Sequence, residues 1–103
     1  MNLAKLAAVL AAVGVLGSAA HAQELNGTLK KIKDTGVITL GVRDSSIPFS
    51  YNIGGVRTVG YSYDINQKIV EAVKDQLKMK DLQVKEIPVT SQNRITLLQN
   101  GTI

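Results

Sequence analysis

The segment Pro88–Ile95 carries a hydroxyl residue and an arginine at a spacing that suits anion binding. Ser91 is predicted to cap a helix, which makes Arg94 the third helical residue, where a capping box would carry Glu or Gln. The first turn of a helix has free N–H groups and a partial positive charge, so a cation is unfavourable there unless an anion joins it. A guanidinium can grip a carboxylate or phosphate with two parallel hydrogen bonds. The alternative is a surface arginine that points into water.

Arg43 is the second candidate, because it directly follows an apolar segment, residues 37–42, that is typical of a buried strand. In open α/β sheets, ligands bind at the carboxyl ends of the strands. The sequence therefore predicts that Arg43 lies at a binding edge. The alternative is an ion pair between Arg43 and Asp44 or another surface acid.

The composition excludes several kinds of chemistry. No Cys occurs in the chain and the only His is His21, so residues 23–103 hold no thiol nucleophile, no imidazole base and no zinc site of the usual ligand types. We therefore expect no metal and no cofactor. The net charge of +4 is modest, and the basic residues are spread out without interleaved aromatics. This pattern argues against nucleic-acid binding and favours a small anionic ligand.

Residues 1–22 have the organisation of a secretory signal peptide. Lys5 supplies the basic start, residues 6–16 form an apolar run, and Ala20-His21-Ala22 fits the cleavage rule. A run of this length is too short to span a bilayer, which needs about 20 residues. We therefore expect an exported protein whose mature part begins at residue 23.

The elements that position the two arginines follow from apolar periodicity and from Gly and Pro punctuation. The order of these elements fits an α/β sheet with right-handed crossovers. The predicted elements are a helix over residues 28–35 with Thr28 as cap and Gly36 as stop, a strand over 37–42, a hairpin with strands 49–51 and 56–59, a helix over 62–78, a strand over 82–87, a helix over 92–100 ending at Gly101, and a strand starting at Thr102.

Two helices are expected to bury apolar stripes. The stripe of the helix over residues 62–78 is Ile65, Ile69, Val70, Val73 and Leu77, and that of the helix over 92–100 is Ile95, Leu97 and Leu98. A strand of two residues at the end of the chain would have no structural purpose. We therefore interpret the sequence as the front part of a longer protein.

Four stretches of the chain carry a resemblance to known proteins: Gly36–Ile38, Val42–Tyr51, Val59–Asp64 and Thr90–Thr102. They resemble the amino-terminal part of the family 3 extracellular solute-binding proteins. Within that family they are most similar to the glutamate/aspartate-binding proteins of ABC importers. The most specific motifs are Val-Arg-Asp-Ser-Ser and Pro-Val-Thr-Ser-Gln-Asn-Arg.

The resemblance implies the first part of lobe 1 of a periplasmic binding protein type II fold, incomplete in this chain. At the matching positions, Arg43, Ser91 and Arg94 would contact an acidic amino acid, glutamate or aspartate, through its side-chain carboxylate. The family's remaining ligand contacts and its second lobe would lie beyond Ile103. Ser62 departs from the family pattern, since many members carry an acid there. The implied protein is a periplasmic monomer without enzymatic activity that delivers its ligand to an ABC permease in the inner membrane.

Two other classes of function stay open. Some relatives of this fold are sensors or exported enzymes, such as dehydratases that act on carboxylated cyclohexadienes. An enzyme needs a general acid or base near the ligand, and only Asp44, Asp64 and Glu86 are eligible in this chain. The other class is an exported structural or interaction module, in which both arginines would lie in solvent.

Overall fold

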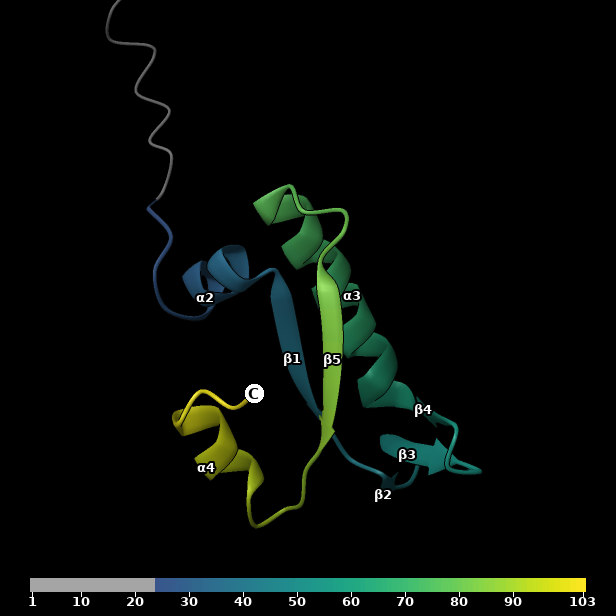
Figure 1. Ribbon diagram of the computed structural model, residues 1–103. Coiled ribbons are helices and arrows are strands. Elements are labelled where there is room, and N and C mark those ends of the chain that lie inside the picture. Colours follow the sequence, from purple (N-terminus) through teal and green to yellow (C-terminus); the bar gives the residue numbers. More distant parts are fainter. Residues whose placement is uncertain (1–23) are drawn as a thin grey trace, which may run out of the picture.

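Two parallel strands form the centre of the structure. β1 (Val37–Val42) pairs with β5 (Gln83–Pro88), in a register that runs from Val37 opposite Gln83 to Val42 opposite Pro88. Because the strands are parallel, both carboxyl ends lie at the same edge, the lower one in Figure 1. The computed structural model describes residues 24–103, so the predicted signal peptide, residues 1–22, lies outside the described residues.

A small antiparallel sheet follows β1. β2 (Ser45–Ser46), β3 (Ser50–Ile53) and β4 (Arg57–Val59) pair in chain order. The predicted hairpin is therefore confirmed, with a turn through Gly54 and Gly55, whose φ angles of 62° and 72° favour glycine. The sequence does not predict β2, because its two serines lack the alternation of apolar and polar residues that is typical of a strand.

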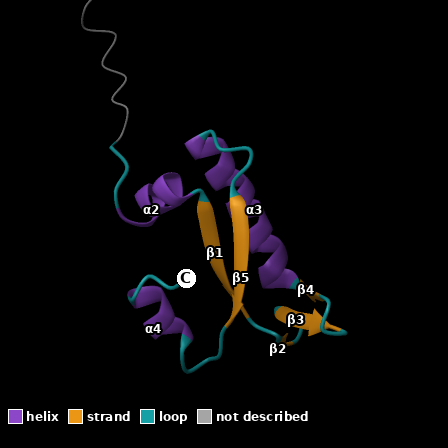
Figure 2. Ribbon diagram, in the orientation of Figure 1, coloured by secondary structure: helices purple, strands orange, loops and turns teal. Residues whose placement is uncertain are grey.

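Within residues 24–103, three helices lie around the central strands (Figure 2): α2 (Gly27–Thr35), α3 (Tyr61–Leu77) and α4 (Arg94–Gln99). The predicted helix over residues 28–35 is confirmed and stops at Gly36, which is left-handed with a φ of 71°. The prediction that Thr28 caps this helix is wrong. The helix already includes Gly27, and Asn26 occupies the cap position without a side-chain bond to the helix.

The inward face of α3 differs from the predicted stripe. Val70 is 1% exposed and Leu77 is also buried, and both join Ile32, Ile38 and Leu82 in the core. The prediction that Ile65 and Ile69 are buried is wrong, since both are exposed. The less exposed positions of α3 are Ser62, Tyr63, Asn66, Gln67, Val70, Val73, Lys74 and Leu77, so the face turned to the rest of the structure includes Ser62 and Asn66 and excludes Ile65 and Ile69. This face is apolar at one end of α3 and polar at the other.

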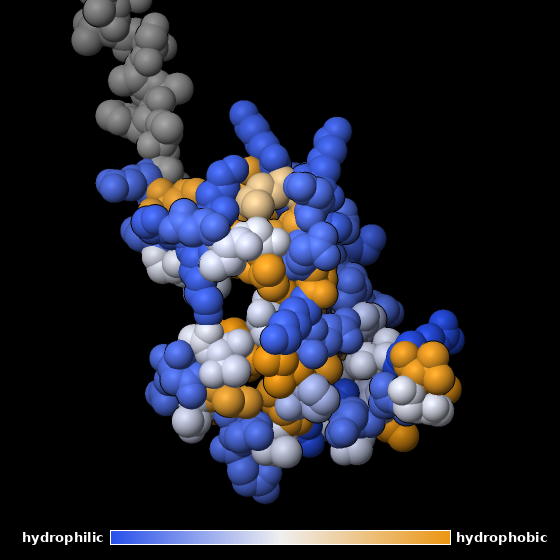
Figure 3. Space-filling model, viewed as in Figure 1, coloured by the Kyte–Doolittle hydropathy of each residue, from blue (hydrophilic) through white to orange (hydrophobic). Residues whose placement is uncertain are grey.

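α4 does not bury its apolar residues. The prediction that Ile95 and Leu98 are buried is wrong, since they are 56% and 62% exposed, and Leu97 is only half-buried. Figure 3 shows the molecule hollowed between α2 and α4, where a cavity of about 280 Å³ lies. The predicted strand at Thr102 is also absent from the described residues. The N–H groups of Thr102 and Ile103 instead donate to the carbonyl of Leu97 and close the end of α4.

The start of α3 is joined to the small sheet at Gly60. The N–H of Tyr61 donates to the Pro48 carbonyl at 3.0 Å, and that of Ser62 donates to the Phe49 carbonyl at 2.8 Å. Gly60 has a φ of 126°, and a Cβ there would clash with the Phe49 carbonyl. The close approach requires glycine, and it fixes the start of α3 against the loop before β3.

A hydrogen bond joins α3 to β5 beside the core. The Tyr63 hydroxyl donates to Glu86 Oε1 at 2.6 Å. This bond, with smaller contributions from burial and from the charges of Glu86 and Asp64, raises the pKa of Tyr63 from 10.0 to about 12. The folded state therefore favours the neutral phenol.

We expect the bond between Tyr63 and Glu86 to stabilise the fold fully below pH 10, because the phenol is then neutral in both states. Its contribution is lost as the pH rises through about 12, where the folded-state phenol ionises. Tyrosinate absorbance should show a component near pH 12 that disappears in Tyr63→Phe. A wild-type titration that is complete before pH 11 would contradict the bond.

We expect Val70→Ala to lower the free energy of unfolding by about 2 kcal/mol, because it opens a cavity in the core. Ile69→Ala, on the next residue of the same helix, should cost less than about 1 kcal/mol, because the side chain is 51% exposed. Denaturant unfolding of both variants measures the difference. Equal losses would mean that α3 is rotated differently about its axis.

Candidate functional site

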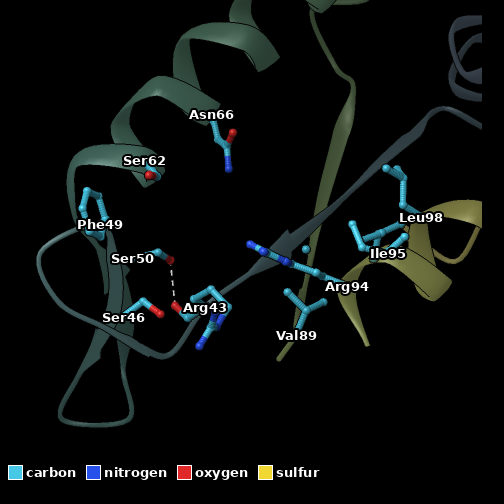
Figure 4. Close-up of a pocket in the computed structure, with 12 residues that line it drawn as sticks. Arg43, Ser46, Phe49, Ser50, Ser62, Asn66, Val89, Arg94, Ile95 and Leu98 are labelled. Carbon is cyan, nitrogen blue, oxygen red and sulfur yellow. Dashed lines mark hydrogen bonds between the residues drawn. The ribbon is translucent and has the colours of Figure 1, made fainter. Parts of the chain in front are cut away.

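A cavity of about 450 Å³ lies beside the edge at which β1 and β5 end. Its polar lining consists of Arg43, Ser46, Ser50, Ser62, Asn66 and Arg94, and its apolar lining includes Phe49, Val89, Ile95 and Leu98. The lining therefore comes from the end of β1, the small sheet, the start of α3 and α4 (Figure 4). These elements lie far apart in the sequence, and the parallel pairing of β1 with β5 brings them together.

Arg43 is held at the end of β1 by contacts on both sides. Its carbonyl accepts a hydrogen bond from the buried Ser50 hydroxyl at 2.7 Å, the dashed line in Figure 4. Its guanidinium donates from Nη1 to the Ser91 hydroxyl at 2.9 Å. Arg43 is half-buried as a residue, while the bond of its guanidinium to Ser91 is exposed. The structure thus brings together two of the predicted site residues, Arg43 and Ser91.

The turn before α4 is capped by Thr90, and the prediction that Ser91 caps this helix is wrong. The Thr90 hydroxyl accepts the N–H of Asn93 at 3.1 Å, and the Asn93 side-chain oxygen accepts the N–H of Thr90 at 2.8 Å. This reciprocal pair has the geometry of a capping box. Thr90 and Ser91 are adjacent hydroxyl residues, and the sequence pattern does not distinguish them. The Ser91 hydroxyl is consequently left for the Arg43 guanidinium.

Arg94 is the first residue of α4, with Asn93 at the position before it, and is not the third helical residue as predicted. Figure 4 shows its side chain extending from α4 into the cavity. The residue is exposed as a whole, so its guanidinium is open to a ligand from solvent. Arg43 and Arg94 therefore line one cavity, as predicted, while Ser91 adjoins it through Arg43.

The cavity has two cations and no acid among its lining residues. Within residues 24–103 the ion pairs are Lys30 with Asp34 and Glu71 with Lys74, so neither arginine is paired with a carboxylate there. The alternative reading of Arg43 as an ion-pair partner of Asp44 is therefore not observed. A cavity lined by two cationic residues and no acid favours an anionic ligand.

The three acids eligible for catalysis do not line the cavity. Asp44 and Asp64 are exposed, and Glu86 accepts the Tyr63 hydroxyl at the side of the sheet. Among residues 24–103, no group of three His, Cys, Asp or Glu side chains could hold a metal ion. The same part of the chain contains no helix that is both long and apolar enough to cross a membrane.

Sequence reasoning missed Ser46, Ser62 and Asn66 as lining residues. Ser62 and Asn66 are four residues apart and so share one face of α3, which continues the buried face of Val70. Both residues are polar, so they do not belong to an apolar stripe. The apolar pattern instead places Ile65 and Ile69 on the predicted inward face of α3. Ser46 gave no comparable signal.

The chain is similar over nearly its whole length to proteins that bind acidic amino acids. It is 51% identical, over 99% of its length, to a glutamate/aspartate import solute-binding protein of Salmonella typhimurium. It is 54% identical, over 93% of its length, to an L-glutamate/L-aspartate-binding protein of Pseudomonas aeruginosa. These matches cover 35% and 32% of the relatives, so the chain spans about a third of their length.

A more distant relative and a solved structure are also amino-acid-binding proteins by name. A putative amino-acid ABC transporter-binding protein of Escherichia coli is 31% identical over 93% of this chain and 27% of its own length. An ancestral cationic amino acid solute binding protein matches with a TM-score of 0.62 at 22% identity, over 75% of this chain and 31% of that one. The α/β fold is therefore that of part of a solute-binding protein. No protein-family model matches the chain.

We expect Thr90→Ala to lower the free energy of unfolding by about 1 kcal/mol, because it removes a capping hydroxyl. Ser91→Ala leaves the cap intact and should cost less, since it removes only an exposed bond to Arg43. Denaturant unfolding of the two single variants compares the adjacent hydroxyls directly. A larger loss in Ser91→Ala would restore Ser91 as the cap.

Proposed function

We propose, on the premise that this chain is a relative of the glutamate/aspartate-binding solute-binding proteins, that it forms part of the ligand-binding lobe of an ABC importer's binding protein. The proposed ligand is an acidic amino acid, glutamate or aspartate. Arg43 and Arg94 would bind its side-chain carboxylate. Ser91 would hold the Arg43 guanidinium and offer its remaining hydrogen-bonding capacity to the same ligand.

The observation that supports this proposal most is the pair of guanidinium groups without a carboxylate in one cavity. A neutral amino acid would leave both cations unpaired once the cavity is closed from water, and this cost disfavours such a ligand. An acidic amino acid supplies the missing charge.

The strength of these contacts fits a transport ligand. A hydrogen bond to a charged group contributes roughly 1.5–3 kcal/mol. Micromolar binding requires about 8 kcal/mol. Two arginines could therefore supply a large share of this free energy, and the rest would come from residues outside this chain.

The proposal extends to the organisation of the whole protein. Residues 1–22 would be a signal peptide that directs export, and residues 23–103 would be the amino-terminal part of the solute-binding domain. The protein would act as a monomer in the periplasm and would deliver its ligand to an ABC permease in the inner membrane. Binding without catalysis agrees with relatives that are named as solute-binding proteins.

We expect Arg94→Ala in the full-length protein to weaken glutamate and aspartate binding more than tenfold, because a charge-assisted contact is lost. Fold stability should change little, since Arg94 is exposed. Calorimetric titration gives the dissociation constant, and thermal unfolding gives the stability.

Arg57→Ala is the matched control, because Arg57 is an exposed arginine of β4 that does not line the cavity. Its dissociation constant should stay within about twofold of the wild type. An Arg94→Ala protein that binds as tightly as this control at the same salt concentration would remove Arg94 from the site.

A further inference from the structure

The polar end of α3 forms a wall of the cavity opposite α4. Ser62 and Asn66 continue the face that carries Val70 in the core, yet both are neutral and polar. Figure 4 shows Asn66 on α3 and Arg94 on α4 directed toward the same part of the cavity from different sides. Asn66 is therefore placed to act on whatever Arg94 binds.

The Asn66 amide has hydrogen-bonding capacity to spare. Within residues 24–103 the Asn66 side chain forms no hydrogen bond. By contrast, the Ser50 hydroxyl donates to the Arg43 carbonyl and the Tyr63 hydroxyl donates to Glu86. The residue is half-buried, so water reaches it only partly. A polar group in such a place loses little by exchanging its water for a ligand oxygen.

The identity of the residue matters as much as its position. A carboxylate at the same place would compete with an anionic ligand for Arg94. An amide keeps the wall polar and leaves the cation free for an outside anion. The acids closest in sequence, Asp64 and Glu71, are exposed and do not line the cavity.

We propose that Asn66 sets the affinity and charge selectivity of the site by donating a hydrogen bond from its side-chain amide to the carboxylate that Arg94 binds. This inference rests on the function proposed above. It adds a third element, α3, to a recognition that would otherwise come only from the chain after β1 and after β5. The ligand carboxylate would lie between a cation on one side and a neutral donor on the other.

The test measures glutamate and glutamine binding to the full-length protein by calorimetry. In Asn66→Ala, the dissociation constant for glutamate should rise about tenfold or more, since one charge-assisted bond is lost. In Asn66→Asp, the loss for glutamate should reach about a hundredfold, because the new carboxylate both repels the ligand and competes with it for Arg94. Glutamine should be affected less, so the preference for glutamate over glutamine falls by at least about tenfold.

Gln76→Glu is the matched control. It adds the same charge to an exposed position of α3 that does not line this cavity, and it should leave both dissociation constants within about twofold. A shift in preference that appears in Asn66→Asp and not in Gln76→Glu supports the proposal, since a general loss of stability would weaken both ligands alike.

Two results would count against the proposal in different ways. If the wild type binds glutamate and both Asn66 variants bind it within twofold of the wild type, Asn66 is not a ligand contact and the proposed function stands. If the wild type binds neither glutamate nor aspartate, the proposed function fails and this inference fails with it.

Discussion

The parallel pairing of β1 with β5 is the constraint on which the site depends. The register that places Val42 opposite Pro88 makes both strands end together, and the bond from the Val89 N–H to the Val42 carbonyl at 2.8 Å extends that alignment by one residue. The chain after β1 then carries Arg43, and the chain after β5 carries Arg94. A slip in this register would separate the two arginines along the sheet edge, although each would still follow a strand.

The charge pattern of the cavity is the second feature that the fold creates. Asp44 directly follows Arg43 and Asp64 lies in the first turn of α3, but both acids are exposed and neither lines the cavity. The result is a local excess of positive charge in a chain whose net charge is only modest. A local excess of positive charge is typical of sites that bind anions. The similarity to proteins that bind acidic amino acids agrees with this physical reading.

Much of the framework could be predicted from sequence. Strand β1 was predicted with its observed bounds because six residues of mostly β-branched and apolar type leave little choice. Gly36 and Gly101 marked helix ends correctly, since only glycine adopts the required left-handed backbone readily. The rule that ligands bind at strand ends predicts a binding edge at Arg43, whereas the pairing of Arg43 with Arg94 is implied by the resemblance to solute-binding proteins; both residues line one cavity.

The errors share a physical origin in choices between neighbouring residues. Thr90 and Ser91 carry equivalent hydroxyls, and tertiary contacts decide which one caps, because the Arg43 guanidinium engages Ser91. On α3, the apolar pattern includes the exposed Ile65 and Ile69 and leaves out the polar Ser62 and Asn66. The predicted inward face of the helix is therefore wrong at this end. The wall of a cavity can be polar where a core face would be apolar, and apolar periodicity alone places such polar residues on the solvent-facing side of a helix.

The close approach at Gly60 has a consequence for how a ligand is received. Because the start of α3 is fixed to the carbonyls of Pro48 and Phe49, the serines of the small sheet and the polar end of α3 behave as one preorganised body. This side of the cavity would therefore have the same shape with and without a ligand. If a ligand binds here, the conformational entropy lost on binding would come mainly from ordering the long, exposed Arg94 side chain, because the other polar lining residues would already be fixed in place.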